Sequence, residues 1–381
     1  MRENWTYKKL GEVCEIVMGQ SPDGNSINEN EGIEFHQGKT CFGERFLSHS
    51  SLYTSKPAKY AEANSVLLCV RAPVGFPNIT KRRICIGRGL CSLVGSEEIT
   101  NMFLFYSLLG KQGYFEKNST GSTFKAISSK VISDVDIPIP PLSEQQSIVA
   151  ELDKINELIN LKKAQLSDLD NLAQSIFYDM FGDPIENEKG WGIKALGSIA
   201  DFKNGLNFSK EESGNCYKFL GVSDFQDNRI VCSDSLNIIH LNDSISEEYL
   251  LQTGDIVFVR SNGSKELVGR NILMQITEPT TFSGFCIRCR LSDNDFNSVY
   301  LSFLLKAPSM RPVITNSGRG CNISNLNQKI LSALPIIYPP LSLQQEFAKR
   351  IELIEQQKAQ ICSTIKDLET LLASRMQHWF D

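Results

Sequence analysis

Residues 137–146 read IPIPPLSEQQ, and residues 335–345 read PIIYPPLSLQQ. In each copy two prolines hold the backbone extended and remove amide donors, which ends strand pairing. The serine and the glutamine three residues later, Ser143 and Gln146 in the first copy, fit the S-x-x-Q capping box of a helix N-terminus. The repeated stretch therefore predicts, twice, the end of a globular segment and the start of a helix.

A heptad pattern of apolar residues follows each predicted helix start. One lysine interrupts each seam, and a single polar seam residue is a known way to fix register. The seam residues are Ile148, Leu152, Ile155, Ile159, Lys162, Leu166, Leu169, Ala173, Ile176 and Met180, then Phe347, Ile351, Ile354, Lys358, Ile361, Ile365, Leu368, Leu372, Arg375 and Trp379. A pattern of this length favours a coiled coil over two unrelated amphipathic helices that pack on their own globules.

The rest of the chain repeats as well. WTYKKLG begins at Trp5 and WGIKALG at Trp191, and short β-rich runs such as 65–72, 255–261 and 285–291 alternate with Gly, Asn and Ser turns. We predict an α+β fold with an internal pseudo-twofold repeat, in which two mixed α/β globules are joined by two long helices. The predicted segments are a globule at 1–141, a helix at 142–182, a globule at 183–340 and a helix at 341–381. If the helices pair antiparallel, the C-terminus at Asp381 would lie near the N-terminus, as Gly182 lies near Trp191.

Common catalytic signatures are missing from the sequence. We find no phosphate-binding GxxxxGK[ST] loop, no dinucleotide turn and no Asn-Pro-Pro-aromatic methyltransferase motif, and the four His are dispersed. Cys286 and Cys289 form a lone CxxC in a predicted strand, where residues three apart face opposite ways, so a shared metal is not expected. We also find no apolar run long enough to span a bilayer and no signal-peptide core, and therefore expect a soluble, cytoplasmic protein.

Charge limits the partners that the chain could bind unaided. The chain has a net charge of −5, and the first globule carries 16 basic and 14 acidic residues, the second 15 and 17. The acidic excess lies on the helices, with 3 basic and 7 acidic residues in the first and 5 and 6 in the second. A protein that bound DNA mainly through its own phosphate contacts would be more basic. If the protein binds DNA, a partner must supply much of the backbone contact.

Within the globules, basic and amide residues cluster in turns, as expected of residues that contact phosphates and base edges. Arg71 and Arg260 each end an apolar run, and we expect them at matching strand ends. The candidate DNA-binding residues are Arg71, Lys81, Arg82, Arg83, Arg88, Ser122, Thr123, Lys125, Arg260, Asn262, Lys265, Arg288, Arg290, Arg319 and Asn322. Each of them is open to the alternative that it is a solvated loop residue.

Over nearly its whole length the chain resembles the specificity subunit of type I restriction–modification enzymes. The resemblance rests on the two PPLSxQQ stretches that open long helices, the W-x-x-K-x-L-G starts, and the segments STGSTFKAIS (119–128) and NSGRGCNIS (316–324). It implies a full-length subunit without an active site, in which each globule recognises one half of a bipartite DNA target. The two helices would form an antiparallel coiled coil that spaces the globules and docks two methyltransferase subunits, and restriction subunits would join that assembly.

The resemblance also implies where cofactors belong. S-adenosylmethionine, ATP and Mg²⁺ would bind the partner subunits, and we expect no cofactor and no metal in this chain. Two alternatives from other classes remain open: a coiled-coil scaffold or adaptor that binds protein partners without base readout, and an enzyme with an unrecognised site in one globule.

Overall fold

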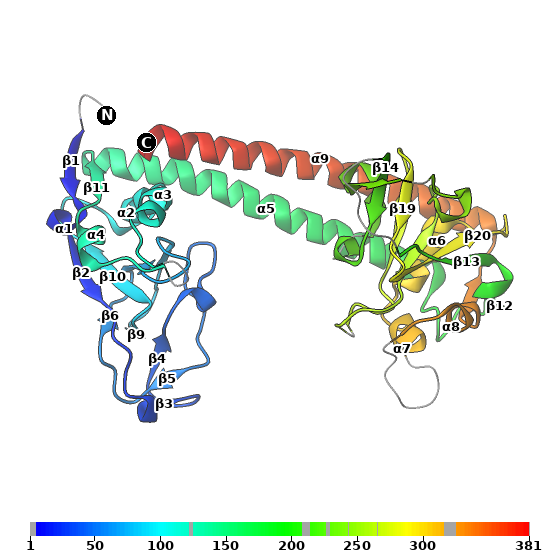
Figure 1. The fold of residues 1–381 in the computed structure, drawn as a ribbon, viewed down its shortest axis with the longest axis horizontal. Helices are drawn as coiled ribbons and strands as arrows, with labels where there is room; N and C mark the ends of the chain where they lie inside the picture. The colour runs from blue at the N-terminus through cyan, green and yellow to red at the C-terminus, as the bar shows by residue number, and fades with distance from the viewer. Residues whose placement is uncertain are drawn as a thin grey trace. The chain divides into compact units, whose positions relative to one another are not determined.

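Figure 1 shows the computed structural model, which describes residues 5–121, 125–207, 214–225, 229–242, 244–264, 266–315 and 325–380. The chain forms two compact units. Unit 1 comprises Met1–Lys163 and Cys362–Asp381, and unit 2 comprises Ala164–Ile361. Each of the two 40-residue helices, α5 (Leu142–Phe181) and α9 (Leu341–Phe380), contributes to both units. Each unit therefore combines a globule with a segment of both helices.

The described part of unit 1 contains three sheets and four short helices. The sheets are β1 (Thr6–Lys9) with β11 (Asp136–Ile139); β2 (Cys14–Met18), β10 (Leu90–Gly95), β7 (Val66–Cys69) and β8 (Pro77–Ile79); and β3 (Ile27–Asn28), β5 (Tyr53–Thr54), β4 (Ile33–His36), β9 (Ile84–Ile86) and β6 (Tyr60–Ala61). The helices are α1 (Leu10–Val13), α2 (Asn101–Leu109), α3 (Gln112–Lys117) and α4 (Ser129–Ser133).

Unit 2 repeats this plan. Its described sheets are β12 (Gly192–Ala195) with β21 (Pro335–Tyr338); β13 (Ala200–Asn204), β20 (Cys286–Leu291), β17 (Ile256–Val259), β18 (Asn271–Gln275) and β15 (Ile230–Cys232); and β16 (Asn237–Leu241), β14 (Asn215–Leu220) and β19 (Thr280–Phe282). The short helices are α6 (Ser298–Leu305), α7 (Met310–Thr315) and α8 (Gln328–Ser332). The order β13-β20-β17-β18 matches β2-β10-β7-β8, with antiparallel pairing throughout both sets. The predicted internal repeat is confirmed.

The central strands are apolar at every position because both of their faces are covered. In β17, Ile256 and Phe258 belong to one hydrophobic cluster, while Val257 and Val259 belong to another on the opposite face. Strand β7 divides its side chains between two clusters in the same way. Strands buried on both faces read as continuous apolar runs, so the runs at 65–72 and 255–261 were identifiable as strands.

The heptad seam is the buried stripe of each long helix. In unit 1, Ile148 and Leu152 are buried in a core that also contains Phe380. In unit 2, Lys358 Nζ donates to Asp170 Oδ1 at 2.9 Å. Farther along α5, residue 177 packs on residue 347, their ring centroids 5.7 Å apart. A higher residue number on α5 thus meets a lower residue number on α9, so the two helices run antiparallel in unit 2. The coiled-coil prediction is confirmed.

The remaining seam positions follow the same pattern. Ile155, Ile159, Ala173, Ile351, Ile354 and Ile361 are buried, and Leu166, Leu169, Ile176, Met180, Ile365, Leu368 and Leu372 are half-buried. In unit 1, the polar seam residue Arg375 forms an ion pair with Glu151.

The predicted capping boxes are wrong. Each long helix begins one residue before the serine, at Leu142 and Leu341, so Ser143 lies inside its helix. The carbonyl of Pro141 accepts the first helical hydrogen bonds, from residues 144 and 145 at 2.9 and 3.0 Å. A proline in the cap position has no side-chain acceptor, so the repeated stretch must be explained differently.

The explanation is the first glutamine of each stretch, which is fully buried. Gln145 Oε1 accepts from the Thr100 amide at 2.9 Å, and its Nε2 donates to the carbonyls of Glu98 and Pro140 at 2.7 and 3.0 Å. In unit 2 the same three bonds join Gln344 to Asn297, Asp295 and Pro339, at 2.9, 3.2 and 2.8 Å. Each glutamine thereby fixes a long helix to the start of a globule helix, α2 or α6.

The two repeated tryptophans pack on helix ends. Trp5 stacks on Trp379 near the end of α9, with ring centroids 6.0 Å apart and an interplanar angle of 9°. Trp191 Nε1 donates to the carbonyl of Phe181, the last residue of α5, at 2.9 Å. Gly182 follows with φ of +75°, a backbone conformation that favours glycine and ends the helix. The end of α9 therefore lies near the start of the chain, as expected.

Candidate nucleic-acid interface

Three exposed basic residues of unit 1 lie together at one end of the sheet that contains β7 and β10. Arg71 follows β7, Arg88 lies in the turn from β9 to β10, and Lys125 precedes α4. The residues on either side of Arg71 donate backbone hydrogen bonds to the carbonyls of Gly89 and Lys125, at 2.9 and 3.0 Å. The sequence proposed these residues singly, and the structure brings them together.

Two exposed glutamines adjoin this cluster and were missed. Gln20 follows β2, and its amide donates to the Ile86 carbonyl at 3.0 Å. Gln37 follows β4 and lies against Gly89, where an added Cβ would be 2.0 Å from the Gln37 carbonyl oxygen. Both glutamines come within two residues of a strand end, as Arg71 does, and that placement is the signal that could have identified them. We call Gln20, Gln37, Arg71, Arg88 and Lys125 the basic edge.

Two further candidates lie elsewhere on the surface of unit 1. Lys81 Nζ sits 3.9 Å from the ring centroid of Phe46. Arg83 pairs with Glu62 at 3.0 Å and lies 4.0 Å from the ring centroid of Tyr60. Both side chains are solvent-exposed, so neither position prevents contact with a phosphate.

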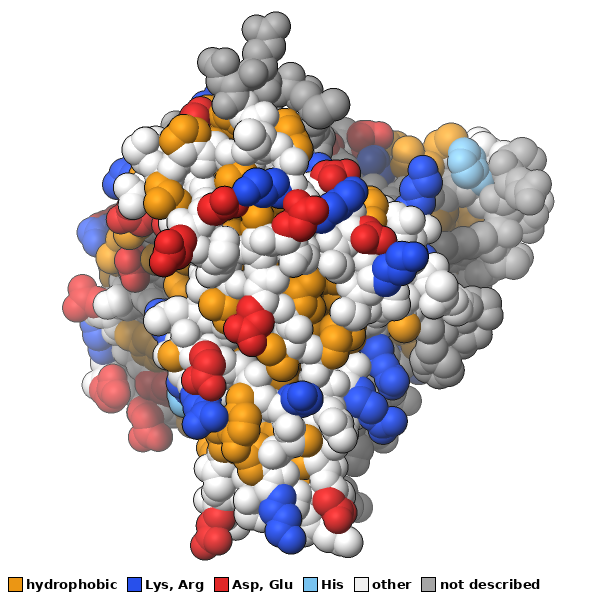
Figure 2. Space-filling model, turned by 90° about the vertical axis from the view of Figure 1, so that its left-hand side faces the viewer, with side chains coloured by type: hydrophobic (Ala, Val, Ile, Leu, Met, Phe, Trp, Pro, Cys, Tyr) orange, Lys and Arg blue, Asp and Glu red, His pale blue; other side chains and the backbone are white. Residues whose placement is uncertain are grey.

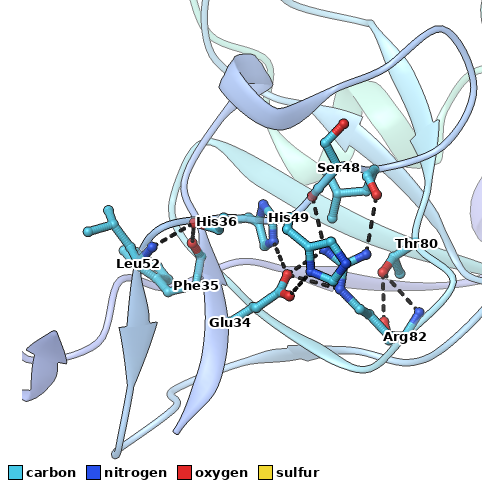
Figure 3. A network of polar contacts seen from close by, with 10 residues as sticks. Glu34, Phe35, His36, Ser48, His49, Leu52, Thr80 and Arg82 are labelled. Atoms are coloured by element: carbon cyan, nitrogen blue, oxygen red, sulfur yellow. Dashed lines mark hydrogen bonds and ion pairs between the residues drawn. The ribbon is translucent and has the colours of Figure 1, made fainter. Parts of the chain in front are cut away.

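Arg82 is engaged inside unit 1. Its guanidinium pairs with Glu34 and donates to the carbonyls of Leu47 and Ser48, as Figure 3 shows. Glu34 also accepts from His36 Nε2 at 3.1 Å and from His49 Nδ1 at 2.5 Å. Burial opposes the charge of Glu34, but these three partners lower its pKa to about 2. We therefore assign Arg82 to the fold.

Arg288 and Arg290 are likewise engaged inside unit 2. Arg288 is only 7% exposed and donates to the Glu248 carbonyl at 2.7 Å. Arg290 holds the buried carboxylate of Asp255 through two hydrogen bonds of 2.7 Å each. Both arginines lie on β20 and stabilise the globule, so they are poor candidates for DNA contact.

The expected match between Arg71 and Arg260 is wrong by one residue. Arg71 bridges Ala126, whereas in unit 2 the residue that bridges Asn325 is Ser261. The amide of Arg260 donates to the Phe285 carbonyl at 2.7 Å, as the residue before Arg71 does to Gly89. Successive side chains of an extended strand face opposite ways. The two arginines therefore do not occupy equivalent faces.

The remaining candidates divide into two groups. Asn262 is exposed, and its Oδ1 accepts from the Ser264 amide at 2.8 Å. Ser122, Thr123, Lys265, Arg319 and Asn322 lie outside the described residues.

The CxxC pair faces two ways, as expected. Cys286 and Cys289 are buried in different hydrophobic clusters on opposite faces of β20, and burial raises the pKa of Cys286 to about 12. Within the described ranges, no group of three or more His, Cys, Asp or Glu side chains is placed to hold a metal ion. In the same ranges no helix combines the length and apolar character needed to cross a membrane.

Figure 2 shows one face of unit 1. Basic and acidic side chains are interspersed there with hydrophobic ones, and neither sign forms a continuous field. The basic edge is therefore a local cluster on a nearly neutral globule, as the charge count of the sequence indicates.

The sequence matches the family described as type I restriction modification DNA specificity domain, over residues 2–171 and again over 188–369. The chain belongs to this family. The two matched ranges correspond to the two halves of the structural repeat, each with one globule and one long helix. The family's description names DNA specificity, which agrees with the sequence prediction of a DNA-recognition subunit.

Several relatives are specificity subunits. The chain is 39% identical over 178 residues to the putative type I restriction enzyme MjaX specificity subunit of Methanocaldococcus jannaschii, which covers 46% of this chain and 42% of that protein. It is 24% identical over 394 residues to the MjaIX specificity subunit of the same organism, covering 92% and 86%. The StySPI specificity subunit of Salmonella potsdam is 27% identical over 250 residues, covering 61% and 53%.

Two solved structures share the fold of this specificity-family chain. The S subunit of a type I restriction-modification system from M. genitalium superposes with a TM-score of 0.54 at 18% identity, covering 98% of this chain and 95% of the other. A chain from work on complex assembly and conformational transition of the type I R-M system gives a TM-score of 0.62 at 18% identity, covering 100% and 98%.

Proposed function

We propose that the protein is the DNA-recognition subunit of a type I restriction–modification complex, in which each unit recognises one half of a bipartite target. The observation that carries the proposal is the basic edge, where Arg71, Arg88 and Lys125 lie at one end of the strands β2-β10-β7-β8. We call the backbone of this end of the sheet the frame. The same frame recurs in unit 2 at the end of β13-β20-β17-β18. Arginine and lysine contact guanine edges and phosphates. A frame that occurs twice, with different residues at its exposed end, suits two different half-sites.

We propose two methyltransferase subunits and further restriction subunits as protein partners. Exposed leucines along the long helices support a docking role. In unit 1, Leu161 of α5 is 58% exposed and Leu371 of α9 is 46% exposed; in unit 2, Leu172 and Leu353 are 48% and 61% exposed. Contiguous apolar patches mark interaction sites, whereas single apolar side chains are common on protein surfaces; we propose that partner subunits cover these leucines. S-adenosylmethionine, ATP and Mg²⁺ would then bind those partners, in the cytoplasm.

The alternative function is a scaffold that binds proteins without base readout. The exposed leucines suit it equally, whereas the basic edge favours DNA recognition. Sequencing of modified bases in host DNA, with and without the gene, separates the two functions. We expect an interrupted methylated motif that disappears on deletion; a methylation pattern unchanged by deletion contradicts the proposal.

A second test concerns dependence on partners. Because the chain is net acidic, we expect the purified chain to bind its target weakly and the complex with methyltransferase to bind it tightly. Fluorescence anisotropy with one labelled duplex measures both. Tight site-specific binding by the chain alone would mean that partner contacts to the DNA backbone are unnecessary.

A further inference from the structure

One end of unit 2 corresponds to the basic edge of unit 1, and the backbone hydrogen bonds match the residues of the two ends one to one. The amide of Leu206 donates to the Phe282 carbonyl at 3.0 Å, as the amide of Gln20 does to Ile86 at 3.0 Å. The bridge at Arg71 recurs at Ser261. The backbone frame is therefore conserved between the units while its side chains change from basic to uncharged.

This end of unit 2 is hollowed into an open cavity of about 650 Å³. Leu206, Phe219 and Val222 contribute apolar surface, and Phe285 lies at the cavity with 57% of its surface exposed. None of the described residues that line the cavity is charged. This described lining offers no cation to a phosphate, and the exposed ring of Phe285 adds to its apolar surface.

Two amide side chains border this apolar surface. Asn207 lies against Gly284, where an added Cβ would be 2.1 Å from Asn207 Oδ1. Gly284 occupies the position that corresponds to Arg88, so the asparagine amide replaces a guanidinium at the exposed end of the frame. Asn262 lines the same cavity, and its bond from the Ser264 amide orients its side chain.

We propose that this cavity of unit 2 recognises an A·T base pair. Asn207 contacts the adenine edge, and Phe285 with Leu206 covers the thymine methyl group. Asparagine pairs with adenine N6 and N7, and apolar side chains recognise the thymine methyl, whereas arginine pairs with guanine. Arg71 and Arg88 of unit 1 accordingly recognise G·C pairs in the other half-site. The inference rests on the proposed function and assigns base types to its two halves.

The test is to map the methylated motif in hosts whose only copy of the gene carries a variant. We expect Asn207→Ala and Phe285→Ala to lower the preference for one A·T pair by about 5- to 150-fold, in one half-site only. Arg71→Ala should relax a G·C pair in the other half-site. Asn237→Ala and Ile238→Ala, at exposed positions on β16 of the same unit, are matched controls and should leave the motif unchanged.

Asn207→Asp gives a test that does not depend on loss of function. Aspartate only accepts hydrogen bonds and therefore pairs with cytosine N4, so the sensitive position should shift from A·T toward C·G. An unchanged motif in the Asn207 and Phe285 variants, or a sensitive position that is G·C in the wild type, overturns the inference. If deletion of the gene removes no motif at all, the proposed function fails and the base assignment fails with it.

Discussion

Arg71 is an exposed arginine at the end of β7, surrounded by Arg88 and Lys125. Replacing Arg71 with alanine removes a candidate base contact. Among the described residues, the structure shows no hydrogen bond or ion pair of its side chain that would be lost. We expect discrimination at one base pair to fall by about 1–3 kcal/mol, with a change in unfolding free energy within about 0.5 kcal/mol. Competition binding with single-base variants of the target duplex measures the first, and urea denaturation the second.

Arg290→Ala is the complementary experiment. It leaves the buried Asp255 carboxylate, 1% exposed, without its two hydrogen bonds from the guanidinium. Because an unpaired buried charge is costly, we expect a loss of about 2–3 kcal/mol in unfolding free energy. Sequence preference should be unaffected in the fraction that remains folded. A stable Arg290→Ala protein with altered preference would reverse our division between structural and recognition arginines.

His36 provides a pH prediction. It is 2% exposed and its Nε2 faces Glu34, while its Nδ1 has no hydrogen-bond partner among the residues that the structure describes. Burial lowers the pKa of His36 below its ordinary value near 6.5, despite the opposing effect of Glu34. Below pH 6.5 the unfolded chain therefore binds a proton that the folded chain excludes, and stability falls as pH falls.

We expect His36→Gln, which keeps a donor toward Glu34 but does not titrate, to reduce this loss between pH 7 and pH 5. Thermal melting at several pH values compares the two proteins. His240→Gln is the control, because that residue lies on β16 in unit 2 and takes no part in the Glu34 network. Parallel melting curves for the wild type and His36→Gln would show that His36 does not contribute.

Sequence reasoning at this scale identified residue types but not their surroundings. Arg71, Arg82 and Arg88 look alike in the sequence. Only the chain path from β4 brings Glu34 to Arg82 and leaves Arg71 and Arg88 exposed. Such a contact between residues 34 and 82 has no local signature, so it could not be predicted.

Among the secondary-structure elements, the starts of α5 and α9 depend on the two buried glutamines. Gln145→Leu preserves approximate side-chain volume but leaves the Thr100 amide and the Glu98 carbonyl without their partner. Each unsatisfied buried group costs about 1–3 kcal/mol. Because both of these hydrogen bonds are only partly buried, we expect a loss in the lower part of the summed range, about 2–4 kcal/mol. The neighbouring exposed Gln146→Leu is the matched control. Urea denaturation compares them, and equal stability of the two variants contradicts the role of Gln145.

The elements themselves were largely predictable. Heptad spacing and doubly buried strands are local patterns, and both long helices, the strands at 65–72 and 255–261, and the helix stop at Gly182 follow from them. The capping prediction was wrong because we assigned the repeated stretch to a local helix cap, whereas its first glutamine makes hydrogen bonds to the globule. The glutamine pair was visible in the sequence, but its bonds reach residues more than forty positions away.

At the scale of the whole molecule, the two long helices are the connection between a first and a second recognition unit. Each contains 40 residues, and each contributes a segment to both units. At about 1.5 Å per residue a helix of this length measures roughly 60 Å. We propose that this length sets the number of unread base pairs between the half-sites, since half-site spacing follows protein geometry.

The helices can be lengthened without disturbing either unit's own contacts. Insertions after Lys163 in α5 and after Ile361 in α9 fall at the boundary between the units. A whole number of heptads preserves the seam. One heptad adds about 10 Å, or about three base pairs, but three base pairs also turn the second half-site by roughly a third of a DNA turn. Three heptads add about 32 Å, close to the 34–36 Å of one full turn.

We therefore expect a double insertion of three heptads to lengthen the spacer by about nine or ten base pairs, with both half-sites unchanged. Sequencing of methylated sites gives the new motif directly. The same insertion in α9 alone should abolish methylation, because α5 then has no equally long partner and the seam pairing of one unit is lost. A double insertion that methylates the original motif would show that the helices do not determine the spacing, since a longer connection would then recognise half-sites at the old distance.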